Sequence, residues 1–207
     1  MKSLKILALG AAAALVAVAV LGAGTAAATN LYRYTTPSAN DRILTGTEIL
    51  LSLNSGTSLL LRDTAGVPND TCTGSEMRLT LEKDTSSLPA TNAQGPMSVF
   101  SLSGCSHTST TLAAGSLEVK SIAGTTNGTA ISKGTRITLK STVFGLSCII
   151  NTGAGTVLGA ITGAKSSTAT AVLDFNAVLT LENGCGDSTV TGTYGVTTPI
   201  GLTVEPS

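Results

Sequence analysis

Strict alternation of apolar and polar residues is the feature that most constrains this chain. In residues 76–83 the apolar residues Met77, Leu79 and Leu81 alternate with residues that are charged or Thr. The pattern returns in 136–140 and in the longer run 171–181. Because successive side chains of a strand point to opposite faces, this period of two predicts strands with one buried and one hydrated face.

Several shorter segments carry the same signal. Further strands are expected at 49–53, 98–102, 117–122, 156–161 and 190–196. Turn-forming pairs such as Asn127-Gly128 and Asn183-Gly184 separate them, and Asn-Gly favours the two-residue turns that match strand twist. No stretch after residue 28 shows helical periodicity with caps. Strands spaced by about 8–12 residues predict an all-β fold, an antiparallel β-sandwich.

The first 28 residues have the composition of a secretory signal peptide. Lys2 and Lys5 precede an apolar run over 6–24, and Ala26-Ala27-Ala28 supplies the small residues of a cleavage site. A retained membrane anchor is the alternative, because about 19 apolar residues nearly span a bilayer. Cleavage would leave 29–207 as a single β-sandwich domain.

Charge and composition exclude several classes of protein. Collagen needs Gly at every third position, and a disordered chain needs more than 12% charged residues. Loss of Lys2 and Lys5 leaves 10 basic and 12 acidic side chains, a net charge of −2. Such a chain has no field that attracts nucleic acid or anionic membranes. We expect a secreted or cell-surface protein, with no nucleic-acid partner and no stable membrane insertion after cleavage.

All four cysteines lie after the predicted cleavage site, which favours disulfides in an exported chain. Of the three pairings that four cysteines allow, the similar intervals favour Cys72–Cys105 and Cys148–Cys185. A metal site is the alternative, but the chain has no C-x-x-C motif and only one His.

The surroundings of the two cysteine pairs resemble each other. Ser103-Gly104 precedes Cys105, Asn183-Gly184 precedes Cys185, and a Thr/Ser-rich stretch and a strand follow each. This suggests an internal duplication of 43–132 and 134–204 within one sandwich. A composition shared by secreted β-proteins explains the similarity equally well, so both interpretations stay open.

A search for catalytic residues gives weak candidates only. His107 is the single imidazole and follows Cys105 closely, but a disulfide leaves no thiolate, and no G-x-S-x-G motif is present. Asp174 is the acid best placed for glycoside hydrolysis, yet its alternating strand predicts a solvent-facing side chain, and the chain has no Trp for sugar stacking. We expect no catalytic residue and no enzymatic activity.

Two loops are candidate ligand sites. The glycine-rich segment 153–159 lacks the third Gly of G-x-G-x-x-G and the Lys of a P-loop, so it is interpreted as a turn before a strand. The segment 63–70 offers oxygen ligands to calcium, but its spacing is not that of a known calcium loop. No cofactor and no metal are expected.

Five motifs carry a resemblance to other sequences. They are DTC at 70–72, SGCSHT at 103–108, IAGTTNGT at 122–129, TGAGT at 152–156 and TGTYGVTTPIGL at 191–202. The chain resembles a group of uncharacterised secreted β-rich proteins of soil actinobacteria. More loosely, its layout is similar to secreted proteins described as activators of alkane oxidation. The resemblance implies export and a β-fold, and no catalytic residue comes with it.

Two functional hypotheses follow. The first is a non-enzymatic secreted or cell-surface protein with an interaction or structural role, which self-associates through sheet edges or belongs to the cell envelope. Its partner is unknown. The alternative is a protein that binds an apolar small molecule between its sheets and assists hydrocarbon uptake. An apolar cavity of at least about 300 Å³ that solvent can reach would favour that alternative, and a fully packed core would rule it out.

Overall fold

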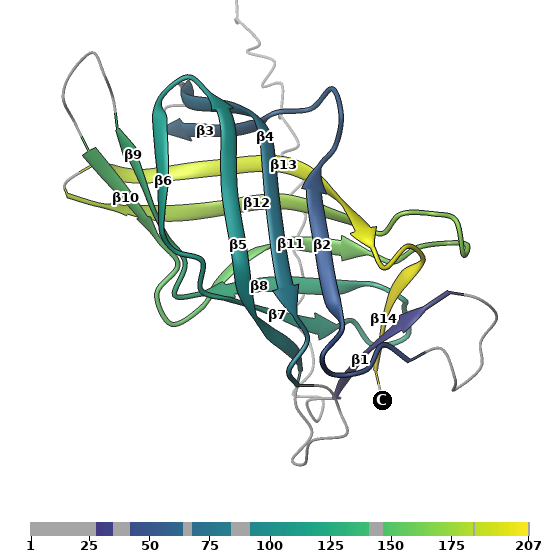
Figure 1. Cartoon of the computed structure of the whole chain (residues 1–207). Coiled ribbons are helices and arrows are strands. Elements are labelled where there is room, and N and C mark those ends of the chain that lie inside the picture. Colours follow the sequence, from purple (N-terminus) through teal and green to yellow (C-terminus); the bar gives the residue numbers. More distant parts are fainter. Residues whose placement is uncertain are drawn as a thin grey trace, which may run out of the picture.

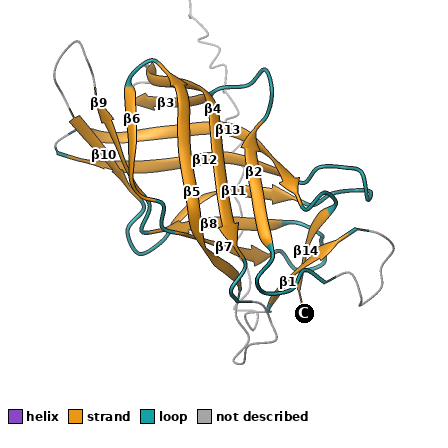
Figure 2. Ribbon diagram, viewed as in Figure 1, coloured by secondary structure: helices purple, strands orange, loops and turns teal. Residues whose placement is uncertain are grey.

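The computed structural model describes residues 28–34, 42–63, 68–83, 92–140, 147–183 and 185–206. These residues form strands and connecting loops without a helix (Figure 2). Accordingly, the described part of the chain has no helix long and apolar enough to cross a membrane. The predicted signal peptide lies outside the described residues except for Ala28.

The strands follow one another along the chain without intervening helices (Figure 1). They are β1 (Thr29–Arg33), β2 (Glu48–Leu53), β3 (Leu59–Asp63), β4 (Pro68–Thr80), β5 (Ala93–Cys105), β6 (Thr108–Ala113), β7 (Ser116–Ser121), β8 (Gly128–Lys133), β9 (Arg136–Lys140), β10 (Ser147–Asn151), β11 (Thr156–Thr162), β12 (Val172–Glu182), β13 (Gly186–Thr198) and β14 (Leu202–Pro206).

The main sheet closes on itself. Strands β2, β4, β5, β7, β8, β11, β12 and β13 pair in that order, and β13 pairs back to β2, so that eight strands form a ring. Every pairing is antiparallel, which confirms the predicted all-β antiparallel class. The predicted sandwich is not confirmed, because the two layers visible in Figure 1 belong to one continuous, flattened barrel.

The four remaining strands of this sheet lengthen the wall of the barrel. β3 pairs with the same two neighbours as β2. In the same way β9 and β10 continue β8 and β11, whereas β6 continues β7 but pairs only with β9. The chain therefore builds eight wall strands: β4, β5, β12, β13 and the bent strands β2/β3, β6/β7, β8/β9 and β10/β11. Each wall strand follows its sequence neighbour around the barrel, as in an up-and-down meander.

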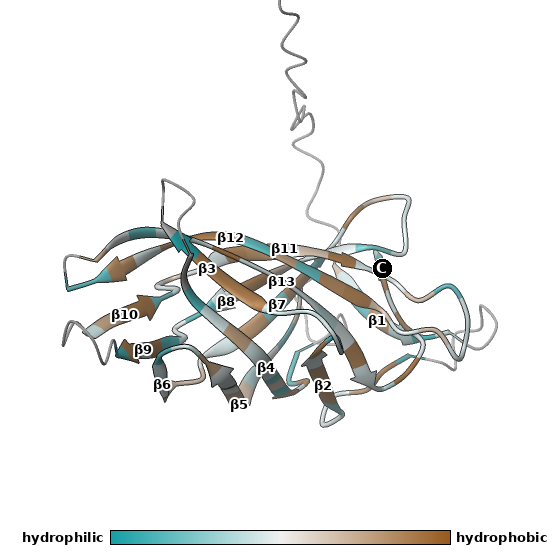
Figure 3. Cartoon of the chain, turned by 90° about the horizontal axis from the view of Figure 1, so that it is seen from above, coloured by the Kyte–Doolittle hydropathy of each residue, from teal (hydrophilic) through white to brown (hydrophobic). Residues whose placement is uncertain are grey.

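The alternating pattern decides which face of the wall is buried. Along β12, Leu173, Phe175, Ala177 and the apolar residues after them point inward, while the intervening residues are exposed. Figure 3 shows hydrophobic and hydrophilic segments alternating along the strands. Burial of one aliphatic face of every wall strand produces the core, as the period of two predicts.

The two terminal strands cover one end of the barrel. β1 and β14 form a separate antiparallel pair from Thr29↔Pro206 to Arg33↔Leu202. Six of its ten residues are buried, among them Leu31 at 2% and Val204 at 0% exposure, and the amide of Val204 donates to the Thr126 carbonyl in the β7–β8 loop. We call this pair the terminal cap. It begins at the residue that follows the predicted cleavage site.

Two disulfides tie the opposite end, where the chain turns between β3 and β4, β5 and β6, β9 and β10, and β12 and β13. Cys72 and Cys105 face each other directly across β4 and β5. Cys148 on β10 bonds to Cys185 in the turn before β13. Both predicted pairings are confirmed. We call this the disulfide end.

The predicted boundary between two related halves lies inside a wall strand. Ser132-Lys133-Gly134 spans the bend between β8 and β9. A similar bend separates β6 from β7 at Gly115, whose φ of +74° places it in the left-handed region, and where an added Cβ would collide with the carbonyl oxygen of Lys133. The duplication itself stays a prediction.

Candidate functional site

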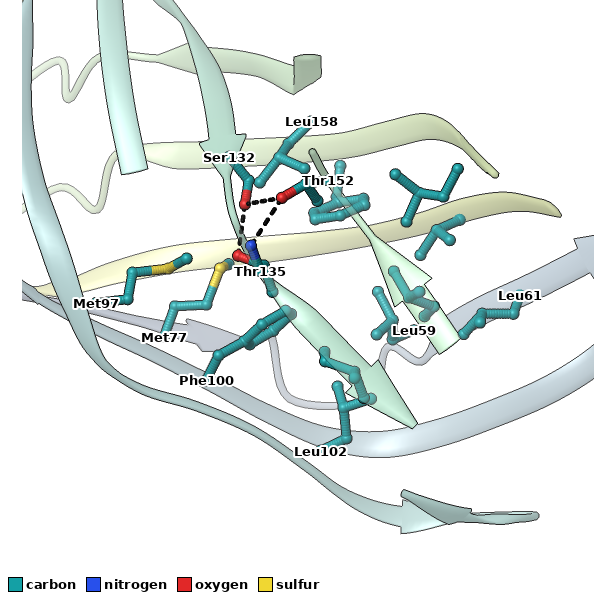
Figure 4. Close-up of a pocket in the computed structure, with 15 residues that line it drawn as sticks. Leu59, Leu61, Met77, Met97, Phe100, Leu102, Ser132, Thr135, Thr152 and Leu158 are labelled. Carbon is teal, nitrogen blue, oxygen red and sulfur yellow. Dashed lines mark hydrogen bonds between the residues drawn. The ribbon is translucent and has the colours of Figure 1, made fainter. Parts of the chain in front are cut away.

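The interior of the barrel contains an apolar pocket toward the disulfide end (Figure 4). Its lining is drawn from every wall strand except β6/β7, and most of it is aliphatic, aromatic or thioether. The lining residues are Leu59, Leu61, Met77, Met97, Phe100, Leu102, Ser132, Thr135, Ile137, Ile150, Thr152, Leu158, Phe175, Leu179 and Val190. This pocket is the strongest candidate site, because ligand sites in proteins are mostly apolar with few polar groups.

Three residues of the pocket wall carry buried hydroxyl groups. Ser132 Oγ lies 2.6 Å from Thr135 Oγ1 and 3.2 Å from Thr152 Oγ1. The Thr135 hydroxyl donates to the Ala114 carbonyl at 2.7 Å, and the Thr135 amide donates to Thr152 Oγ1 at 2.9 Å. Figure 4 shows the three grouped on one side. Their hydrogen bonds fix the bends of β8/β9 and β10/β11, and their oxygen atoms offer no polar surface to the pocket.

The empty space in the pocket is small. The cavity has a volume of about 20 Å³. A second apolar cavity of about 20 Å³ lies beneath the terminal cap, where Leu31 and Leu202 meet residues of the barrel. Either space admits about one water molecule. With the side chains as they stand, neither reaches the size expected for an apolar ligand.

A second cluster surrounds Asp70 at the disulfide end. Asp70 is only 2% exposed, and its Oδ1 accepts from the Ser106 hydroxyl at 2.6 Å and from the amides of Thr71 and His107 at 2.8 and 3.2 Å. Nδ1 of His107 lies 3.5 Å from the same oxygen. These contacts hold the β5–β6 turn against β4.

The Asp70 cluster contains a serine, a histidine and an aspartate but lacks the order of a catalytic triad. In a triad the serine hydroxyl donates to the imidazole, which in turn donates to the carboxylate. Here Ser106 donates to Asp70 directly, so the geometry does not activate its oxygen as a nucleophile. His107, the imidazole weighed from sequence, is thus placed in a structural contact with Asp70.

Asp70 also belongs to the one group of potential metal ligands among the described residues. That group joins Asp70 to Cys72 and Cys105. The two sulfur atoms are bonded to each other and cannot act as thiolate ligands. Residues 64–67 of the calcium segment considered from sequence lie outside the described residues.

The remaining sequence candidates lie apart from the pocket. Asp174 is exposed on the outer face of β12, and its Oδ1 accepts from the Thr193 hydroxyl at 3.5 Å. The glycine-rich segment 153–159 forms the end of a turn and the start of β11, as expected. The structure therefore brings neither of them together with His107.

A buried carboxylate forms an ionic cluster on the outer side of β7. Glu118 is 6% exposed, and Lys133 and Asn92 donate to its two carboxylate oxygens, with Lys120 Nζ at 3.9 Å. Burial opposes ionisation, but the hydrogen bonds from Lys133 and Asn92 and the charges of Lys133 and Lys120 outweigh it and lower the pKa of Glu118. This cluster stabilises the wall and lies outside the pocket.

Sequence analysis missed the contact between Asp70 and His107, although a usable signal was present. In an antiparallel pair with Cys72 opposite Cys105, position 70 falls opposite position 107. The predicted disulfide therefore already implied that the single histidine faces a carboxylate. The pocket carried no comparable signal, since its lining is spread over seven wall strands.

Comparisons of the chain with protein-family models, with curated proteins and with solved structures find no match.

Proposed function

We propose that this chain is an exported, non-catalytic binding protein whose barrel interior accepts a slender apolar molecule. The observation that carries the proposal is the apolar pocket enclosed by seven of the eight wall strands. Eight-stranded barrels have an interior that side chains just fill or that holds one small ligand. The pocket surface is entirely apolar, because the hydroxyls of Ser132, Thr135 and Thr152 bond to one another and to the backbone.

The ligand has to displace side chains, because the cavity measures about 20 Å³. Met77 and Met97 line it together with the half-buried Phe100. Unbranched methionine side chains repack readily around different shapes. Binding by repacking predicts a ligand that is thin and flexible, such as an alkyl chain, in preference to a rigid ring system.

Closure of the ring bears on the alternative of self-association or a role in the cell envelope. Sheet edges promote assembly because they offer unpaired backbone groups, and closure removes most of them from the main sheet. Both edges of the terminal cap carry backbone bonds to neighbouring loops, so this alternative depends on the edges of β5 and β6 that lack backbone pairing with each other. Concentration-dependent oligomers in light scattering, lost when those edges are blocked, would favour it over the interior site.

Export is supported by the two disulfides, since such bonds persist in oxidising compartments. The terminal cap gives further support, because it starts at Thr29, the first residue after the predicted cleavage site. Mass spectrometry of the protein secreted by its native host tests this part, and a mature chain that begins at Thr29 is expected.

The binding proposal is tested by titration with cis-parinaric acid, a thin polyene fatty acid whose fluorescence rises in apolar surroundings. Because the chain has no Trp, its own fluorescence interferes little. Leu179→Phe fills the pocket from β12, whereas Val178→Phe changes the adjacent residue, which is 64% exposed on the outer face. We expect saturable binding that Leu179→Phe weakens at least about tenfold and Val178→Phe leaves unchanged. Absence of saturable binding, or equal loss in both variants, contradicts the proposal.

A further inference from the structure

One seam of the barrel wall lacks backbone pairing. β5 pairs with β7 from Ala93↔Val119 to Pro96↔Ser116, and the last backbone bond across this seam runs from the Met97 amide to the Gly115 carbonyl. Beyond that point β6 pairs only with β9, although β5 and β6 are both fully described. We call the part between Met97–Cys105 and Thr108–Ala113 the β5–β6 seam.

Side-chain hydroxyls take the place of amides along this seam. Thr111 Oγ1 donates to the Phe100 carbonyl, and Ser109 Oγ donates to the Leu102 carbonyl at 3.4 Å. Both bonds depend on rotatable side chains that are partly or fully open to water. Ser109 Oγ also lies 3.7 Å from Cys105 Sγ on β5. Opening the seam therefore breaks the side-chain bonds of two residues, whereas opening any paired seam breaks a ladder of backbone bonds.

The seam leads directly into the apolar pocket. Met97, Phe100 and Leu102 on the β5 side line the pocket, and β6 contributes no lining residue. Residues 85–117, which include both sides of the seam, contain no Asp, Glu, Lys or Arg. An apolar molecule that passes between these strands meets no charged group whose hydration it must disturb.

The other routes to the pocket are better closed. The terminal cap covers one end, and its buried strands are bonded to the loops around them. At the other end the two disulfides join β4 to β5 and β10 to the turn before β13, and Asp70 fastens the β5–β6 turn. The β5–β6 turn at the disulfide end of the seam is thus fixed. The rest of the seam is held by weak side-chain hydrogen bonds.

We propose that the β5–β6 seam is the entry and exit route of the apolar ligand, with Thr111 and Ser109 acting as its latch. This inference rests on the proposed binding function. It predicts that the latch residues control the rate of ligand exchange and leave the equilibrium affinity nearly unchanged. A change in the route alters the rates of entry and exit alike, because it changes the free-energy barrier to passage and not the free energy of the bound state.

Stopped-flow fluorescence with cis-parinaric acid tests the route. The variant Ser109→Ala/Thr111→Val removes both hydroxyls, and Thr110→Val is the matched control, since its side chain points to the opposite face of the same strand. We expect association and dissociation rates that both rise about threefold to tenfold in the double variant, from the loss of the modest hydrogen bonds that these hydroxyls make. The dissociation constant should change less than about twofold, and Thr110→Val should behave as the wild type.

The outcomes separate the two proposals. Saturable binding with exchange rates unchanged in the double variant overturns the seam as the route and leaves the interior site standing. Saturable probe binding that Leu179→Phe does not weaken, or no saturable binding to the wild type, overturns both. A change in affinity without a change in rates assigns the hydroxyls to the bound state and also overturns the route.

Amide hydrogen exchange gives a second readout that needs no ligand. Amides at 98–104 and 109–112 that face the seam should exchange faster than inner amides of β12, which are paired on both sides. Ser109→Ala/Thr111→Val should accelerate the seam amides further and leave β12 unchanged. Protection along the seam equal to that of β12 contradicts a weakly bonded wall at this place.

Discussion

The phenol of Tyr194 donates a hydrogen bond of 2.9 Å to the hydroxyl of Ser75, and both side chains are buried. Tyr194 lies on β13 and Ser75 on β4, two wall strands that β2/β3 separates. Leu53 at the end of β2 pairs with Tyr194, and residues 54–58 directly after it interrupt β2/β3. The bond therefore joins β13 to β4 across the place where the wall strand between them is broken.

Removal of either partner should destabilise the barrel by different amounts. Ser75→Ala leaves the buried phenol without its acceptor and should lower the free energy of unfolding by about 1–3 kcal/mol. Tyr194→Phe removes the hydroxyl donor together with the cost of burying it, so it should lower the free energy of unfolding by only about 0.5–1.5 kcal/mol. Urea unfolding of both variants and of the double variant measures their coupling. Strictly additive effects would show that the bond contributes nothing.

The same tyrosine predicts a loss of stability at high pH. Burial raises the pKa of Tyr194 to about 12, and the hydrogen bond with Ser75 offsets only part of this effect. Since the folded pKa is above the ordinary value of 10.0, the contribution is complete below pH 10 and is lost as pH rises toward 12. The loss should reach about 2–3 kcal/mol. Urea unfolding at pH 8 to 11.5 should show a steeper decline for the wild type than for Tyr194→Phe, and parallel declines would contradict the buried phenol.

Glu118 predicts an opposite dependence at low pH. Burial works against its ionisation, but the partners Lys133, Asn92 and Lys120 hold the pKa of this carboxyl below its model-compound value of 4.5. Its contribution to stability is therefore complete above pH 4.5 and disappears as pH falls through the lowered pKa. Glu118→Gln should unfold more easily at pH 7 by about 1–3 kcal/mol and should lose part of the acid sensitivity. Glu48→Gln changes an exposed side chain and is the control. It should change neither the free energy of unfolding at pH 7 nor the acid sensitivity. A Glu118→Gln variant as stable as this control would disprove the role of the cluster.

The disulfides should contribute stability at one end of the barrel. Cys72–Cys105 and Cys148–Cys185 close loops of similar length, with separations of 33 and 37 positions. In the loop-entropy description each contributes about 3–4 kcal/mol, so replacing either pair by Ala should lower the free energy of unfolding by up to that amount. Urea unfolding of the two paired variants provides the comparison. An unchanged midpoint in both variants contradicts this account of the disulfide end.

The local part of the fold was predictable from sequence because alternation reports which face of a strand is buried. The runs at 136–140 and 171–181 coincide with β9 and almost with β12. Strand β6 was not predicted from sequence, because its sequence, TSTTLA, has hydroxyl groups on both faces and no alternation of apolar and polar residues. That composition follows from its place beside the unpaired seam, where its side chains bond to β5 and bury little surface.

Closure of the sheet could not be derived from the same signal. Whether β13 returns to pair with β2 depends on two segments more than 130 residues apart, and alternation is identical in a sandwich and in a barrel. The apolar pocket was hidden for the same reason, since Leu59, Phe100 and Leu158 come together only when the ring closes. The disulfides were accessible, because cysteine number and spacing limit the pairings to three.

Methyl NMR of the mature protein tests the interior site most directly. The chain has three methionines, and cleavage of the signal peptide removes Met1, so that ¹³C-methyl labelling of methionine reports only on Met77 and Met97, both of which line the pocket. On titration with dodecanol, whose alkyl chain is thin and flexible, both methyl signals should shift and saturate together. If neither signal moves while the dodecanol stays in solution, the barrel interior does not bind apolar chains.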